Sequence, residues 1–172
     1  ESLEKIHKDN RRLENSILCG GICIPSRRKE SKNLIIKSEC GAEFFTTQVL
    51  CDSGNVIKMI KNYQERCDKV NTFPRRILLS FAPVSSQKNI DFLKWLGVEI
   101  PKDTERYLNG RPGAMTERSL DVAIEVLNEI LAFIANNNLK VPVGLNVEHI
   151  MSYNFQSSVE MLQELANIYR KF

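Results

Sequence analysis

Four apolar runs of strand length recur along the chain and are separated by segments with helical spacing. The runs are nearly continuous in apolar or small residues, as is typical of strands covered on both faces of a parallel sheet: Ile17 to Pro25, Glu43 to Leu50, Arg75 to Pro83 and Lys140 to Val147. Two apolar stripes with a helical period lie between them, formed by Val56, Ile57, Ile60 and Tyr63 and by Leu120, Ala123, Ile124, Leu127, Leu131 and Ile134. A strand followed by a helix, four times over, predicts parallel strands with crossover helices.

Four parallel strands fit either an open doubly wound sheet or part of an eight-stranded barrel. The doubly wound alternative requires a Gly-rich turn after the first strand, whereas Gly20-Gly21 lies inside the first run. We therefore predict an α/β fold of the (β/α)8 TIM-barrel type. The segment from Pro101 to Met115, which contains Gly110, Pro112 and Gly113, is predicted as one long loop, either over an active site or as a plain surface excursion.

The charged residues are spread along the chain and leave no broad basic surface for nucleic acid. The 172 residues include 24 basic and 21 acidic ones, for a formal net charge of +3. The densest basic run, Arg27-Arg28-Lys29, is followed at once by Glu30. It is interpreted as a solvated loop or a phosphate clamp, with contact to a nucleic acid backbone as a further alternative. We expect no nucleic acid partner.

The five cysteines form neither a metal-binding nor a disulfide pattern. They are odd in number and lack both a CxxC spacing and a nearby histidine cluster. Cys19, Cys23 and Cys51 fall in or at the end of apolar runs, where a free thiol behaves as a small hydrophobe. This usage indicates a reducing, intracellular compartment, and we expect the cytoplasm. We expect no metal.

No stretch approaches the ~20 apolar residues of a membrane span, and the start at Glu1-Ser2-Leu3 is no signal peptide. We therefore expect no membrane partner. The absence of an initiating Met hints at a piece of a longer protein.

Polar residues follow the predicted strands, at the ends that would meet at one mouth of a barrel. They are Pro25-Ser26-Arg27-Arg28, Gln48 with Asp52, Pro83-Val84-Ser85-Ser86 and Asn146-Val147-Glu148-His149. Catalytic groups of barrels come from the ends of several different strands. Together these residues predict a polar ring on an apolar scaffold.

Three polar residues after the first strand share a helix face. Glu30, Asn33 and Lys37 stand at i, i+3 and i+7, while Leu34 and Ile35 can point toward the sheet. The face offers a carboxylate for hydroxyls, an amide, and an ammonium for a phosphate. The alternative is a solvated helix face with an incidental Glu-Lys pair.

The order and spacing of these residues resemble the methylenetetrahydrofolate reductase family. That family has a strand ending near Pro, an acidic residue, Asn three later and Lys four after that, then Ala-Gly-Ala, a Thr-Gln strand end and an Asp. The matching positions here are Pro25, Glu30, Asn33, Lys37, Cys40-Gly41-Ala42, Thr47-Gln48 and Asp52. Further similarity lies in Leu79 to Val84 and in Phe92 followed by Val98-Glu99-Ile100-Pro101. The resemblance implies that residues 1–172 form a single domain, supplying about the last four βα units of the barrel.

The resemblance implies FAD as cofactor and NADH or NADPH as electron donor. By position, Glu30, Asn33 and Lys37 would line the ribityl and phosphate part of FAD. Arg28 stands near the place of a family His that touches flavin, and an Arg can pair with phosphate instead.

A folate substrate is also implied. Gln48 would bond its pterin ring, since an amide offers a donor and an acceptor at once. Phe92 would stack on folate or on the nicotinamide nucleotide. The alternatives are pairing of Gln48 with neighbouring backbone and packing of Phe92 between helix and barrel.

Several positions depart from the family pattern. Ile24 stands where the family has a Tyr, and Asn146-Val147-Glu148-His149 replaces a Tyr and an Arg that hold substrate. His149 is either an acid or base or a solvated loop residue. The family's catalytic Glu lies on an early strand outside this chain, so we assign no catalytic residue here and expect the chain by itself to be inactive.

The leading hypothesis is a flavin-dependent reductase of one-carbon metabolism that converts methylenetetrahydrofolate into methyltetrahydrofolate, a step toward methionine biosynthesis. The first alternative is a pterin-binding or regulatory relative without catalysis. The second is a barrel enzyme for another small molecule. The oligomeric state is left open, with a homo-oligomer among the alternatives.

Overall fold

Four parallel strands form one sheet in the order β1-β2-β3-β4. The computed structural model describes residues 17–110 and 115–172. The strands are β1 (Gly20–Cys23), β2 (Phe44–Val49), β3 (Arg76–Phe81) and β4 (Val143–Val147). Each of the four predicted apolar runs contains one of them, so the predicted strands and their parallel direction are confirmed.

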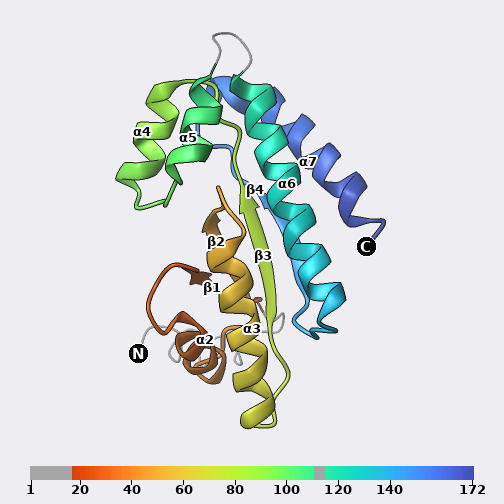
Figure 1. Cartoon of the computed structure of the whole chain (residues 1–172). Helices are drawn as coiled ribbons and strands as arrows, with labels where there is room; N and C mark the ends of the chain where they lie inside the picture. Colours follow the sequence, from red (N-terminus) through yellow and green to blue (C-terminus); the bar gives the residue numbers. More distant parts are fainter. Residues whose placement is uncertain (1–16, 111–114) are drawn as a thin grey trace.

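Helices connect and follow the strands (Figure 1). They are α2 (Glu30–Glu39), α3 (Gly54–Lys69), α4 (Gln87–Trp95), α5 (Lys102–Asn109), α6 (Met115–Asn136), the short 3-10 turn η1 (Ser152–Asn154) and α7 (Phe155–Tyr169). The helix α5 corrects the prediction of one long loop from Pro101 to Met115, of which residues 111–114 lie outside the described part. Asp103 and Glu105 in the first turn of α5 suit the positive end of the helix dipole, and Leu108 anchors the helix by burial.

The main core lies on one face of the sheet. Strands joined in sequential order by right-handed crossovers place all their helices on the same side. On that side Phe45, Ile77 and Leu79 are fully buried against α3, α6 and α7. The latter two helices lie side by side along the sheet in Figure 1. Ile60 and Tyr63 of the first predicted stripe, and Ala123, Leu127, Leu131 and Ile134 of the second, belong to this core.

The opposite face is only partly covered by the described residues. Ile22 of β1 is 59% exposed, and Thr46 and Leu78, which follow it in register across β2 and β3, are half-buried. From the continuous apolar runs, we predicted that both faces of the sheet would be covered. The described part of the chain fully covers one face only. A sheet with one face packed on helices and the other facing inward is what a barrel segment requires.

A second apolar cluster lies at the carboxyl ends of the strands. It joins Val49, Ala82 and Val84 to Ile90 and Leu93 of α4, with Cys51, Val98 and Leu108 completing it. Figure 1 shows α4 and α5 beyond the tip of β3, at the top of the view. These two helices therefore flank the edge of the sheet at which polar residues were predicted.

Burial confirms the predicted character of three cysteines. Cys19, Cys23 and Cys51 are buried, and all five cysteines are free thiols. Burial raises the pKa of Cys23 and of Cys51 to about 12, so both thiols are protonated at neutral pH. Among the described residues, no helix has the length and hydropathy of a membrane span.

Candidate functional site

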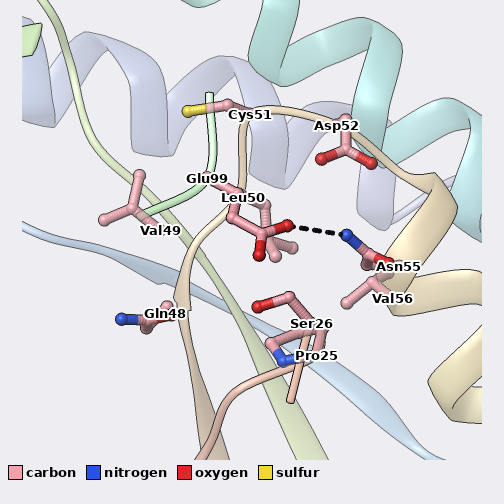
Figure 2. Close-up of a pocket in the computed structure, with 10 residues that line it drawn as sticks. All are labelled: Pro25, Ser26, Gln48, Val49, Leu50, Cys51, Asp52, Asn55, Val56 and Glu99. Carbon is pink, nitrogen blue, oxygen red and sulfur yellow. Dashed lines mark hydrogen bonds between the residues drawn. The ribbon is translucent and has the colours of Figure 1, made fainter. Parts of the chain in front are cut away.

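Two hollows lie beside the carboxyl ends of β1 and β2. The first is lined by residues from the β1 and β2 ends, the start of α3 and the turn before α5: Pro25, Ser26, Gln48, Val49, Leu50, Cys51, Asp52, Asn55, Val56 and Glu99 (Figure 2). The second lies between the β1–α2 loop and α3 and is lined by Pro25, Ser26, Arg27, Arg28, Lys29, Glu30, Ser31, Asn55, Lys58, Met59 and Asn62. The predicted polar strand ends of β1 and β2 therefore do meet.

The first hollow is narrow and carries two carboxylates. It offers about 30 Å³ of water-accessible space, which suffices for one or two water molecules. Asn55 Nδ2 donates to Glu99 Oε2 over 3.1 Å, as the dashed line in Figure 2 shows. Asp52 Oδ1 accepts the main-chain N–H of Gly54 over 2.9 Å at the start of α3. A heterocycle would have to lie over this hollow, because the space inside it is too small.

A bulge in β2 sets the position of Gln48. Thr46 pairs with Leu78 but Val49 pairs with Ser80, so one extra residue of β2 is accommodated between them. The Thr47 hydroxyl accepts the main-chain N–H of Ser80 over 2.9 Å, taking the place of a ladder carbonyl. Bulges commonly re-aim side chains beside active sites.

The Gln48 amide reaches the turn after α4. Its Nε2 donates to the Leu96 carbonyl over 3.3 Å, and Figure 2 shows the side chain directed away from the Asn55–Glu99 pair. Gly97 takes a φ of +84°, a conformation that favours glycine, as the chain turns there. Backbone pairing, the alternative to ligand binding for Gln48, thus occurs through its nitrogen, and its carbonyl oxygen makes no hydrogen bond within the described part.

Glu30, Asn33 and Lys37 come together, but they bind one another. The Glu30 side chain is only 1% exposed and accepts hydrogen bonds from Lys37 Nζ (2.9 Å), Asn33 Nδ2 (3.1 Å) and the Ile24 N–H (3.3 Å). Burial by itself would raise the pKa of Glu30, but these donors outweigh it and hold the pKa below its usual value. Lys37 also donates to the Ile22 carbonyl of β1 and keeps a side-chain exposure of 23%. The predicted shared face is confirmed, and it is not merely a solvated one.

Arg28 lines the second hollow together with Glu30, whereas neither Asn33 nor Lys37 lines it. Of the four residues predicted for one cofactor, two thus meet at the basic hollow, and the other two are held by hydrogen bonds to Glu30.

Phe92 forms an aromatic pair on α4. Its ring stacks on that of Trp95, with centroids 5.8 Å apart and an interplanar angle of 23°. Trp95 is 78% exposed and Phe92 is half-buried. The pair is an accessible surface for stacking, and neither ring lines the two hollows described above.

The ends of β3 and β4 carry a polar cluster on the inner face of the sheet. Ser80 pairs with Asn146 in register, and Asn146 Nδ2 donates to Ser80 Oγ (3.0 Å) and more weakly to Glu148 Oε1 (3.5 Å). Burial raises the pKa of the half-buried Glu148, and a hydrogen bond with Ser80 offsets only part of that rise. Sequence reasoning found Asn146 and Glu148 but missed Ser80, whose position opposite Asn146 depends on the strand register.

His149 and the end of β3 have less direct roles. His149 is exposed and meets the ring of Phe155 edge-on, with centroids 5.3 Å apart. Ser85 Oγ donates within a network of Asn89 and Asn154, and Asn154 Nδ2 donates to the Pro83 carbonyl over 3.2 Å. This network ties the β3 end, α4 and η1 together, so Ser85 is structural. Among the described residues there is no group of three or more His, Cys, Asp or Glu able to hold a metal ion.

Comparison with known proteins decides the family. The profile of methylenetetrahydrofolate reductase matches residues 23–165. The chain belongs to the methylenetetrahydrofolate reductase family. The match includes every residue assigned above to cofactor or folate, from Arg28 to Phe92.

Two further relatives are similar over part of their length. An uncharacterized protein from Clostridium thermocellum, described as binding two copies of 5-methyl-5,6,7,8-tetrahydrofolic acid, superposes with a TM-score of 0.81 at 23% identity, covering 96% of this chain and 59% of its own. At this identity the likeness shows the α/β fold with its parallel sheet. A transaldolase from Prochlorococcus marinus (strain MIT 9301) is 30% identical over 129 residues, 73% of this chain and 34% of that protein. The chain thus spans only part of both relatives.

Proposed function

We propose that this chain is the folate-binding half of a reductase-like barrel in one-carbon metabolism, supplying about the last four βα units. The observation that carries the proposal is the meeting of Gln48, Asp52 and Asn55 at the carboxyl ends of β1 and β2 in a chain of this family. Ligands of α/β barrels bind at that edge. The half-covered sheet face supports the barrel, because further strands would close over it.

The finer proposal is a flavin-dependent reductase, in which bound FAD takes hydride from NADH or NADPH and supplies it to methylenetetrahydrofolate. The residues present fit such a cofactor in a limited way. Lys37 uses two of its three N–H groups on Glu30 and Ile22, and Asn33 uses one of its two. One ammonium hydrogen, one amide hydrogen and the amide oxygen are left for a phosphate and for ribityl hydroxyls.

In this arrangement Glu30 is a positioning residue. Its carboxylate is buried and fully engaged, so it orients Lys37 and Asn33 and does not itself touch a ligand. Phe92, paired with Trp95, would supply the stacking surface for the folate or for the nicotinamide.

The second candidate is a pterin-binding or regulatory protein without catalysis. It is favoured by the run Asn146-Val147-Glu148-His149, which replaces the substrate-holding Tyr and Arg residues of the family. The closed hydrogen bonding of Glu30, Asn33 and Lys37 also suits a protein with no flavin.

Spectroscopy and titration of the natural protein that contains this chain separate the two candidates. A reductase is expected to be yellow as purified, to bind 5-methyltetrahydrofolate and to oxidise NADH or NADPH with a folate acceptor. A colourless protein that takes up no added FAD but binds folate would favour the second candidate. Failure to bind any folate would overturn both.

A further inference from the structure

Glu148 is a half-buried carboxylate without a counter-charge. Its main-chain N–H donates to the Phe81 carbonyl over 2.7 Å, which extends the β3–β4 ladder beyond the last paired residue and fixes the position of Glu148. Within the described residues Glu148 forms no ion pair. Burial raises its pKa, so the ionised carboxylate lowers the stability of the fold at neutral pH. A charge that is kept at such a cost is typical of a functional site.

Two neighbouring side chains orient this carboxylate. Asn146 Nδ2 donates to Ser80 Oγ over 3.0 Å and more weakly to Glu148 Oε1 over 3.5 Å. Ser80 is fully buried, and its backbone is fixed because its N–H donates to the Thr47 hydroxyl and its carbonyl accepts the Leu50 N–H, each over 2.9 Å. A carboxylate can accept about four hydrogen bonds. Within the described residues only Asn146 and Ser80 bond to it, so Glu148 can accept further donors from a ligand.

The cluster of Ser80, Asn146 and Glu148 borders the open face of the sheet. It lies at the carboxyl ends of β3 and β4, the edge at which barrel ligands bind, and it lines neither of the two hollows. Beside it on the same face, Leu78 is half-buried and Ile22 is 59% exposed. A flat ring that lies on this face would therefore meet apolar contacts over its surface and hydrogen-bond acceptors at one edge.

We propose that Glu148 binds the amino-pyrimidinone edge of a pterin ring. The inference rests on the proposed function and applies to both of its candidates. This edge of a pterin presents two parallel N–H donors, from the ring N3 and the 2-amino group, and they match the two oxygens of one carboxylate as a guanidinium does. The corresponding edge of a flavin presents a single N–H between two carbonyl oxygens, which a carboxylate repels. Glu148 thus selects a pterin over a flavin at this position.

A ligand that lacks the 2-amino group tests the contact. The natural protein is titrated with 5-methyltetrahydrofolate and with its 2-desamino analogue, which has lost one of the two donors. We expect the natural ligand to bind roughly tenfold more tightly, the effect of one hydrogen bond to a charged group. Glu148→Gln keeps the size of the side chain but removes the charge. It should weaken binding of 5-methyltetrahydrofolate by a similar factor and should lose most of the preference for the 2-amino group.

Thermal melting separates this role from a structural one. Glu148→Gln should be at least as stable as the unmodified protein at pH 7, because it removes a carboxylate that the fold disfavours, although it binds folate less tightly. A structural role would lower stability and affinity together. Glu148→Asp keeps the charge and should retain part of the preference for the 2-amino group. Glu164→Gln is the matched control, since Glu164 is exposed on α7, and it should change neither stability nor affinity.

Three outcomes would overturn the proposal. Equal affinities of the unmodified protein for the two ligands would remove the contact while leaving folate binding intact, whereas no binding of either ligand would remove the proposed function as well. A full preference for the 2-amino group in Glu148→Gln would place the acceptor elsewhere in the protein. If Glu148→Gln changed the uptake of FAD and left both folates unaffected, the carboxylate would face the flavin instead.

Discussion

Replacement of Glu30 by Gln tests the buried network that organises the β1–α2 region. The substitution keeps the size of the side chain but removes the charge that Lys37 and Asn33 bind at 2.9 and 3.1 Å. Hydrogen bonds to charged groups are worth about 1.5–3 kcal/mol each. Lys37 is partly exposed and can turn to solvent. We therefore expect the substitution to lower the free energy of unfolding by about 2–3 kcal/mol at neutral pH. For a chain of this size that corresponds to a fall in melting temperature of about 4–12 °C.

The pH dependence provides a second readout. The folded protein holds the pKa of Glu30 below its usual value, so the stabilisation is complete above the unfolded pKa of about 4.3. It is lost as the pH falls through the lower folded pKa. Glu30→Gln lacks this contribution at every pH, so the difference between the two proteins should close in acid.

The assay is thermal and urea unfolding of both proteins between pH 3 and 7. Glu39→Gln is the control, because Glu39 is exposed on the same helix. A loss below about 0.5 kcal/mol, or one that is matched by Glu39→Gln, is the size of an ordinary surface change and would refute the reasoning. If the difference in the free energy of unfolding stayed constant down to pH 3, Glu30 would not be stabilising the fold through an ionised carboxylate.

Three further outcomes follow from the same geometry. Gln48→Ala should weaken folate binding roughly tenfold in a titration, because neutral hydrogen bonds worth about 0.5–1.5 kcal/mol each are lost. Uptake of FAD should be unchanged. An unchanged affinity for folate would contradict the proposed contact between Gln48 and the pterin ring. Glu148→Gln should raise the melting temperature slightly at pH 7, because the raised pKa of Glu148 in the folded protein means that the fold favours a neutral side chain there. The gain should vanish below the unfolded pKa of Glu148. A variant that is less stable at pH 7 would contradict this account of Glu148. Iodoacetamide labelling followed by mass spectrometry should modify Cys40 well before Cys23 or Cys51; early labelling of Cys23 would show that its thiol is accessible.

Much of the fold follows from local pattern. The four apolar runs contain the four strands, and the stripes from Val56 to Tyr63 and from Leu120 to Ile134 lie in helices of the core. The helix α5 was missed because Leu108 is its one buried residue, which leaves no apolar stripe to detect. The surrounding Gly110, Pro112 and Gly113 made a loop the better prediction.

The amino-acid sequence by itself determined the strands and the shared helix face of Glu30, Asn33 and Lys37, because backbone geometry sets those periodicities over short distances. The alternation of strands and helices indicated the parallel direction. The order and spacing of the polar residues after the first two strands indicated the family. Only the tertiary structure decided that Glu30 is buried and binds its two neighbours, since burial depends on the packing of α2 against β1 and α3. The Ser80–Asn146 pair depends on the register of β3 and β4. The basic hollow likewise depends on the packing of α3, which brings Lys58 to the same hollow as Arg28, thirty positions earlier, and no local pattern encodes that packing.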